Sequence, residues 1–234
     1  MFDANRYVML LGSLPYHGPL FGAKQTPVSR IQLNQRLGLL RPDEAGCLRT
    51  ARALIEWSQQ ETRRSDAAFL AHARARIDAL QHPFVRELVI WRLELRTLVA
   101  ALRRRHRGES APLDQHWGYG RWVELVRRHW NEPAFGLDVA FPWLPQAQRH
   151  LDRGESLDLE RLLGTVAWNH LERVSDGHHF DFEAVVVYVM RWDMIASWTG
   201  DKDAAALERF DALVANAMRA VEQQLMQAAD TARP

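Results

Sequence analysis

The stretch over residues 83–106 constrains the fold most, because its apolar residues recur at intervals of three and four. Those residues are Leu88, Trp91, Leu95, Leu98 and Leu102. This spacing is typical of an amphipathic helix whose apolar stripe packs on a core. Pro83 opens the stretch and Gly108 follows it, as expected at the two ends of a helix. The spacing therefore predicts one long helix here.

The same period appears in most of the chain. Helical spacing recurs from residue 42, from about 65 to the residue before Pro83, over 156–174, over 181–198, and in an alanine-rich stretch from about 204 to 228. A shorter pattern ends at Pro133, and the aromatic, proline-broken residues 134–145 after it indicate a hinge. No alternating run is bounded by hairpin turns. We therefore predict an all-α multi-helix bundle.

The opening segment Tyr7–Ala23 contains no charged residue, but prolines and glycines interrupt it. A membrane-spanning helix needs roughly 20 consecutive apolar residues, which this segment does not supply. Asp3 and the lack of a small-residue cleavage site argue against a signal peptide. We expect an extended N-terminal segment that packs on the domain.

Composition excludes several classes of protein. The chain has 30 Lys and Arg against 29 Asp and Glu, so a net charge of +1 gives no general attraction to nucleic acid. Its single cysteine, Cys47, cannot form an intramolecular disulfide and indicates no cysteine zinc site. These features predict a cytoplasmic protein that binds no nucleic acid.

Residues 170–181 concentrate histidines and carboxylates, the usual ligands of metal sites. They are His170, Asp176, His178, His179 and Asp181. Their spacing matches no standard ligand pattern; Asp176 and Gly177 favour a turn, and Asp181 suits the N-cap of the next helix. We expect no metal and no cofactor, with His170 in the core, and keep a metal-dependent hydrolase using His178, His179 and Asp181 as one alternative.

No catalytic residue is predicted, because the chain lacks a phosphate loop and a G-x-S-x-G elbow, and Cys47 lies within a predicted helix. The basic run with Arg103, Arg104 and Arg105 has two interpretations. It could bind phosphates or lipid head groups, or it could complement the C-terminal dipole of its helix. We favour the second.

The helix predicted at residues 181–198 is apolar on every side but carries Arg191 and Asp193 near its middle. Neither residue has an opposite charge three or four positions away, so if buried each needs a partner on another helix or another protein. The helix at 83–106 carries a similar pair, Glu94 and Arg96. This likeness predicts two or so packed helical units, 1–135 and 136–234, or one continuous domain.

Three stretches carry a family resemblance: YVMLLGSLP at residues 7–15, ELVIWRLELRTLVAALRRR at 87–105, and the run from GTVAWNHLERV to TGDKD at 164–203. In this order they resemble a bacterial family of uncharacterised proteins associated with V-type ATPase gene clusters. More distantly, the chain is similar to the C-type subunit of A/V-type ATPases, whose eukaryotic counterpart is the d-type subunit.

The resemblance implies a non-enzymatic, all-helical socket that couples the central stalk to the proteolipid ring of the rotor. The implied partners are stalk and proteolipid subunits, and the implied location is peripheral at the inner membrane. The C-type subunit has three helical units and is considerably longer than 234 residues, so a closed funnel is in doubt. A helical adaptor with another protein partner is the alternative of a different class.

Overall fold

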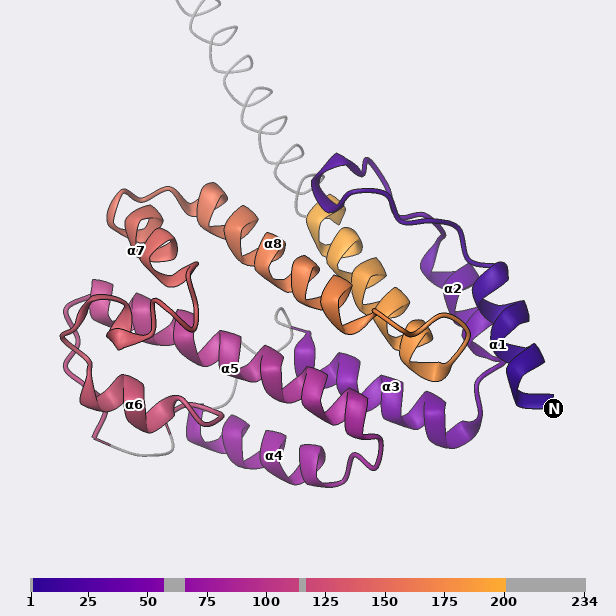
Figure 1. The fold of residues 1–234 in the computed structure, drawn as a ribbon, viewed down its shortest axis with the longest axis horizontal. Coiled ribbons are helices and arrows are strands. Elements are labelled where there is room, and N and C mark those ends of the chain that lie inside the picture. The colour runs from indigo at the N-terminus through magenta and orange to yellow at the C-terminus, as the bar shows by residue number, and fades with distance from the viewer. Residues whose placement is uncertain (1, 57–65, 114–116, 201–234) are drawn as a thin grey trace, which may run out of the picture. The chain divides into compact units, whose positions relative to one another are not determined.

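The computed structural model describes residues 2–56, 66–113 and 117–200 (Figure 1). These residues contain helices and no β-strand, so the predicted all-α class is confirmed. The helices are α1 (Phe2–Gly12), α2 (Arg30–Leu37), α3 (Pro42–Ile55), α4 (Asp66–Asp78), α5 (Pro83–His106), α6 (Val123–Arg128), α7 (Leu144–Asp152) and α8 (Ser156–Val174), with short 3-10 helices η1 (Leu20–Gly22) and η2 (Pro133–Gly136). A final helix runs over residues 182–200.

The chain forms two compact units. The first contains residues 1–16 and 28–191, and the second contains residues 17–27 and those from 192 onward. The division that we predicted near residue 135 falls inside the first unit, at η2. The alanine-rich helix predicted at about 204–228 lies outside the described residues.

Helix α5 is the centre of the first unit, with bounds that match the prediction. It packs against α3, α4, α6 and α7 (Figure 1). The residues of its predicted stripe that are buried are Leu88, Leu95, Leu98 and Leu102, while Trp91 is half-buried. Pro83 lies in the first turn, where a missing N–H costs nothing. Burial on several sides makes α5 a helix of the interior.

The C-terminal half of α5 is covered by an aromatic cluster from the irregular region. Trp130 lies between Trp117 and Phe135, with ring centroids 6.2 and 5.6 Å away, and Leu144 is fully buried in the same cluster. Phe135 has a φ of 57°, in the left-handed region that is rare for bulky residues. Its complete burial compensates for that backbone strain.

Helix α1 corrects the prediction for the N-terminal segment. Residues 7–12 are helical, with Tyr7 and Leu10 buried, and the largely non-helical segment begins only at Ser13. The prediction of an extended conformation for residues 7–12 was wrong. Tyr7 and Leu10 lie three positions apart, so in a helix they form one stripe that packs on the rest of the unit. The sequence pattern also missed α7, where Pro145 lies in the first turn of the helix.

The final helix begins at an N-cap, as predicted. Asp181 Oδ1 accepts a hydrogen bond from the Ala184 backbone N at 2.8 Å. Val185, Val186 and Val189 are fully buried, which fits a helix that is apolar on all sides. In the second unit, Trp198 meets Phe21 edge to face, with ring centroids 4.8 Å apart. None of the described helices has the length and apolarity to cross a membrane.

Candidate functional site

The basic residues at the end of α5 bind other segments of the protein. The Arg105 guanidinium donates hydrogen bonds to the backbone oxygens of Trp130 (3.2 Å) and Glu132 (2.6 Å) and to Gln148 Oε1 (2.6 Å). It also lies 4.3 Å from the Phe135 ring centroid. Arg105 therefore joins α5 to η2 and α7, and its guanidinium is not presented to a phosphate.

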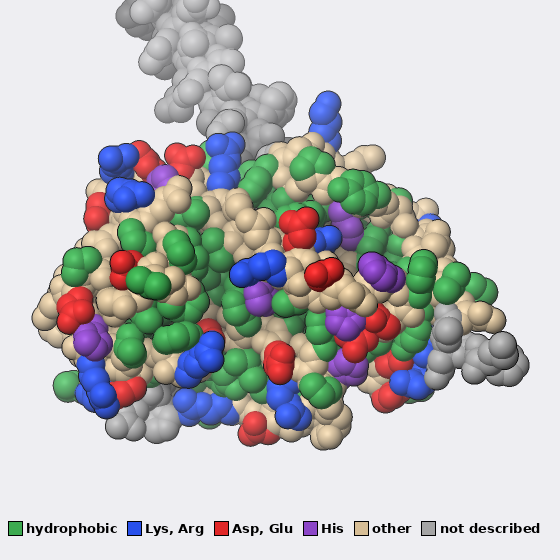
Figure 2. Space-filling model, in the orientation of Figure 1, with side chains coloured by type: hydrophobic (Ala, Val, Ile, Leu, Met, Phe, Trp, Pro, Cys, Tyr) green, Lys and Arg blue, Asp and Glu red, His purple; other side chains and the backbone are tan. Residues whose placement is uncertain are grey.

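The other arginines of the run support a cap at the end of α5. Arg104 and Arg107 bind the two carboxylate oxygens of Glu109, at 2.8 and 2.6 Å, and these hydrogen bonds lower the pKa of Glu109. The Glu109 N–H donates to Arg104 O and the Gly108 N–H donates to Arg105 O, the pattern of a glycine-terminated helix. Arg103 is half-buried. On the face drawn in Figure 2, positive and negative side chains are intermingled.

Glu94 and Arg96 occupy different surroundings. Glu94 is buried, and its Oε1 accepts a hydrogen bond from the Arg121 backbone N at 3.0 Å. Gly120, with a φ of 96°, lies so close that an added Cβ would be 2.2 Å from Glu94 Cγ. Glu94 thus holds the loop that precedes α6, and Arg96 is half-buried on the same helix.

A cavity of about 820 Å³ lies beside Glu94. The ring of His170, on α8, stacks on Trp91 of α5 with centroids 3.5 Å apart and planes 3° apart. Burial, together with the nearby charges of Arg173 and Arg92, lowers the pKa of His170 to about 4. The imidazole is therefore neutral near pH 7, and it is a half-buried packing residue that also lines the cavity.

Arg191 and Asp193 are both half-buried. The Arg191 guanidinium lies 5.1 Å from the centroid of the Trp168 ring on α8, a cation–π contact outside its own helix. Burial lowers the pKa of Arg191, an effect that the charge of Glu172 opposes. Asp193 belongs to the second unit.

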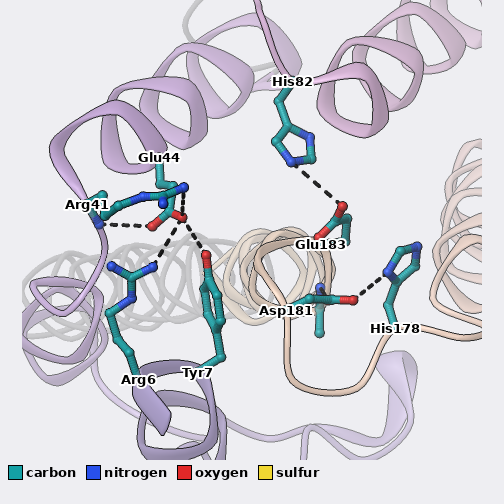
Figure 3. A network of polar contacts seen from close by, with 9 residues as sticks. Arg6, Tyr7, Arg41, Glu44, His82, His178, Asp181 and Glu183 are labelled. Atoms are coloured by element: carbon teal, nitrogen blue, oxygen red, sulfur yellow. Dashed lines mark hydrogen bonds and ion pairs between the residues drawn. The ribbon is translucent and has the colours of Figure 1, made fainter. Parts of the chain in front are cut away.

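A buried carboxylate, Glu44, organises the polar contacts around a second cavity (Figure 3). Its Oε1 accepts hydrogen bonds from the Tyr7 hydroxyl and from Arg6 Nη2, the latter at 3.4 Å, and lies 2.9 Å from Arg41 Nη2. Its Oε2 accepts from the Arg41 backbone N at 2.9 Å. One side chain thus binds α1 to the start of α3. Burial and the hydrogen bond to Glu44 raise the pKa of Tyr7 to about 12.

The other side of this cavity brings together histidines and carboxylates from two parts of the chain (Figure 3). His178 Nδ1 lies 2.7 Å from Asp181 Oδ2, and His82 Nε2 lies 3.7 Å from Glu183 Oε1. The cavity has a volume of about 570 Å³, and His82, Asp181 and Glu183 line it. His179 is exposed and is not part of this group.

Sequence reasoning missed His82 and Glu183. Glu183 is two positions after Asp181, in the first turn of a helix, where a carboxylate is a favourable partner of the dipole and suggests no further role. His82 is the N-cap residue of α5, far away in sequence. Because no spacing rule connects these positions, only the packing of α5 against the start of the final helix could reveal them.

Residues 53–220 match a family described as "Protein of unknown function (DUF2764)". The chain belongs to this family. No curated protein and no solved structure matches the chain. The match therefore assigns the chain to a family but does not assign an activity to it.

Proposed function

We propose that this DUF2764 protein is a non-enzymatic component similar to the C-type subunit of V/A-type ATPases, which couples the central stalk to the membrane rotor ring. One observation carries the proposal: the three stretches that resemble that family contact one another in the first unit. Trp91 of the second stretch stacks on His170 of the third. The Tyr188 hydroxyl donates to the Pro15 backbone oxygen at 2.9 Å.

The contacts of the charged residues also support a structural role. Glu94 and Arg105 each bind backbone groups of neighbouring segments, as expected of residues that stiffen a helical body. A metal-dependent hydrolase built on His178, His179 and Asp181 is less well supported, because His179 is exposed and outside the group.

The test is affinity purification of the full chain from native membranes, with identification of the co-eluting proteins by mass spectrometry. We expect stalk and proteolipid subunits to be enriched, and membrane association to depend on the rotor ring rather than on lipid. If repeated purifications recover neither class while the protein stays in the soluble fraction of cells that make the ATPase, the proposal fails. Recovery of a different protein would favour the helical adaptor.

A matched pair of variants sharpens this test. Met9 is 60% exposed in α1, within a stretch that carries the resemblance, and Val139 is 90% exposed outside those stretches. An exposed apolar side chain at a partner surface tolerates a charge poorly. We expect Met9→Glu to reduce the recovery of stalk subunits and Val139→Glu to leave it unchanged. Equal recovery from both would show that Met9 of α1 does not contact the stalk subunits.

A further inference from the structure

We propose that His82, His178, Asp181 and Glu183 form a binding site for a divalent transition-metal ion, with zinc as the ion that fits their chemistry. This site is independent of the rotor proposal. His82 comes from the start of α5, and the other three surround the start of the final helix. The spacing of the histidines alone argued against a metal, but the structure adds Glu183 at the same helix start and His82 from the start of α5.

The distances within this group suit one ion. Ligand atoms of His178, Asp181 and Glu183 all lie within 4.8 Å of one another, and His82 Nε2 is 3.7 Å from Glu183 Oε1. Two ligands bound at about 2.0–2.1 Å to a tetrahedral ion lie about 3.4 Å apart. Small side-chain movements would therefore bring His178, Asp181 and Glu183 to bonding distance, while His82, which lies next to Glu183 but outside this group of three, would need a larger one.

The imidazole ring of His82 is available to bind a metal ion. Its Nδ1 is buried without a hydrogen-bond partner, and its Nε2 is 3.7 Å from the Glu183 carboxylate, beyond hydrogen-bonding distance. An ion between His82 Nε2 and Glu183 would therefore displace no existing hydrogen bond of either ring nitrogen.

Aromatic neighbours hold both imidazoles. The His82 ring meets Phe182 edge to face at 5.0 Å, and the His178 ring meets Phe84 in the same way at 5.2 Å. Such packing limits the rotation of the rings, which lowers the cost of organising a metal site. His82 and Phe84 flank Pro83, so α5 begins at the proposed site.

The donor set favours zinc over magnesium or calcium. Two imidazole nitrogens with two carboxylate oxygens are typical zinc ligands, whereas magnesium and calcium prefer oxygen alone. The 2.7 Å contact between His178 Nδ1 and Asp181 Oδ2 is a hydrogen bond, so zinc would replace the proton between these atoms. Two carboxylates balance the charge of the ion. The adjoining cavity, lined by His82, Asp181 and Glu183, provides access for the ion.

The test uses full-length protein without an affinity tag, treated with a chelator, dialysed, and titrated with zinc chloride by calorimetry. We expect one equivalent to bind, and Glu183→Gln and His82→Asn each to weaken binding by at least about tenfold. His179→Asn is the control for an exposed neighbour. His150→Asn is the control for a second group, His150 with Glu155 and Asp158, which also has metal-ligand spacing. Both controls should bind zinc like the unchanged protein.

Two results would overturn the site: no zinc uptake by the unchanged protein, or zinc binding that Glu183→Gln and His82→Asn leave intact. Loss of zinc in His150→Asn would assign the ion to the other group. Far-ultraviolet spectra and Tm establish that each variant folds. Cobalt(II) added to the unchanged protein gives a measurement that needs no variant, since its visible bands report nitrogen and oxygen ligands, and their absence would also count against the site.

Discussion

At the scale of single residues, Glu44 shows how a buried charge can organise a fold. It is 5% exposed and contacts Arg6, Tyr7 and Arg41, whose positions bring α1 against α3. A buried carboxylate is tolerated only when its oxygens are well paired. Both oxygens of Glu44 are paired here, and removing them would take the acceptor from the Tyr7 hydroxyl and an ion pair from each of Arg6 and Arg41.

We expect Glu44→Ala to destabilise the protein by about 3–5 kcal/mol, because it breaks a buried charge network and a helix cap. The neighbouring Asp43 is the control: its side chain is 73% exposed and pairs with Arg41 at 3.5 Å. Asp43→Ala should cost less than about 1 kcal/mol. Urea unfolding of both variants measures the difference, and equal costs would contradict the structural role of Glu44.

The lowered pKa of His170 predicts that the stability of the folded protein depends on pH. Its pKa of about 4 in the folded protein lies below the ordinary value of 6.5, so the unfolded chain takes up a proton first as the pH falls. The stability contributed by the neutral ring is complete above about pH 6.5 and is lost as the pH falls toward about 4. We expect the Tm of His170→Gln to fall less steeply over this window than that of the unchanged protein. The exposed His179→Gln is the control, and parallel pH profiles for His170→Gln and the unchanged protein would refute the assignment.

At the scale of secondary-structure elements, the basic residues at the end of α5 make contacts within the protein. Arg105 reaches η2 and α7, while Arg104 and Arg107 share Glu109. A planar guanidinium can donate to several oxygens at once, which an ammonium cannot do in the same geometry. The run therefore ends α5 and fastens the aromatic cluster around it.

Arg105→Ala should destabilise the protein by about 2–3 kcal/mol, because it removes hydrogen bonds from a charged donor to backbone oxygens. Arg107, whose side chain is 58% exposed, is the matched control, and Arg107→Ala should cost less than about 1 kcal/mol. Thermal unfolding compares the two variants. If Arg105→Ala leaves Tm unchanged but abolishes binding to anionic vesicles, the run binds lipid head groups instead.

At the scale of the whole molecule, the described residues form helices around apolar interiors without any sheet. In the first unit, α5 and the valines of the final helix are buried, and polar contacts such as those of Glu94 and Glu44 fix the loops and termini around them. Close-packed interiors of this kind resist deformation. That property suits a component that transmits torque, as proposed.

The purified full chain should give a far-ultraviolet circular dichroism spectrum dominated by helix, well above the roughly one-third helix of average globular proteins. The helices of the described residues, from α1 to the final helix, together predict this. A spectrum dominated by sheet would contradict both the sequence periodicity and the structure.

Elements whose signals are local could be predicted from the amino-acid sequence. The bounds of α5 and α8, and the N-cap at Asp181, follow from apolar spacing, proline, glycine and short polar side chains. These signals act within a few turns of the backbone, so they can be read without knowing the fold. For the basic run, the sequence favoured a helix end over a phosphate site but did not show which groups the arginines contact.

Contacts between residues far apart in the sequence became known only from the packed fold. It made residues 7–12 helical against α3, gave Phe135 a left-handed backbone that burial sustains, and turned Arg105 toward η2. It also placed His82 beside Glu183. Each of these depends on contacts between segments far apart in the chain, where side-chain burial and electrostatic pairing outweigh local preference. Spacing along one chain carries no information about such pairs, because they exist only after the helices pack.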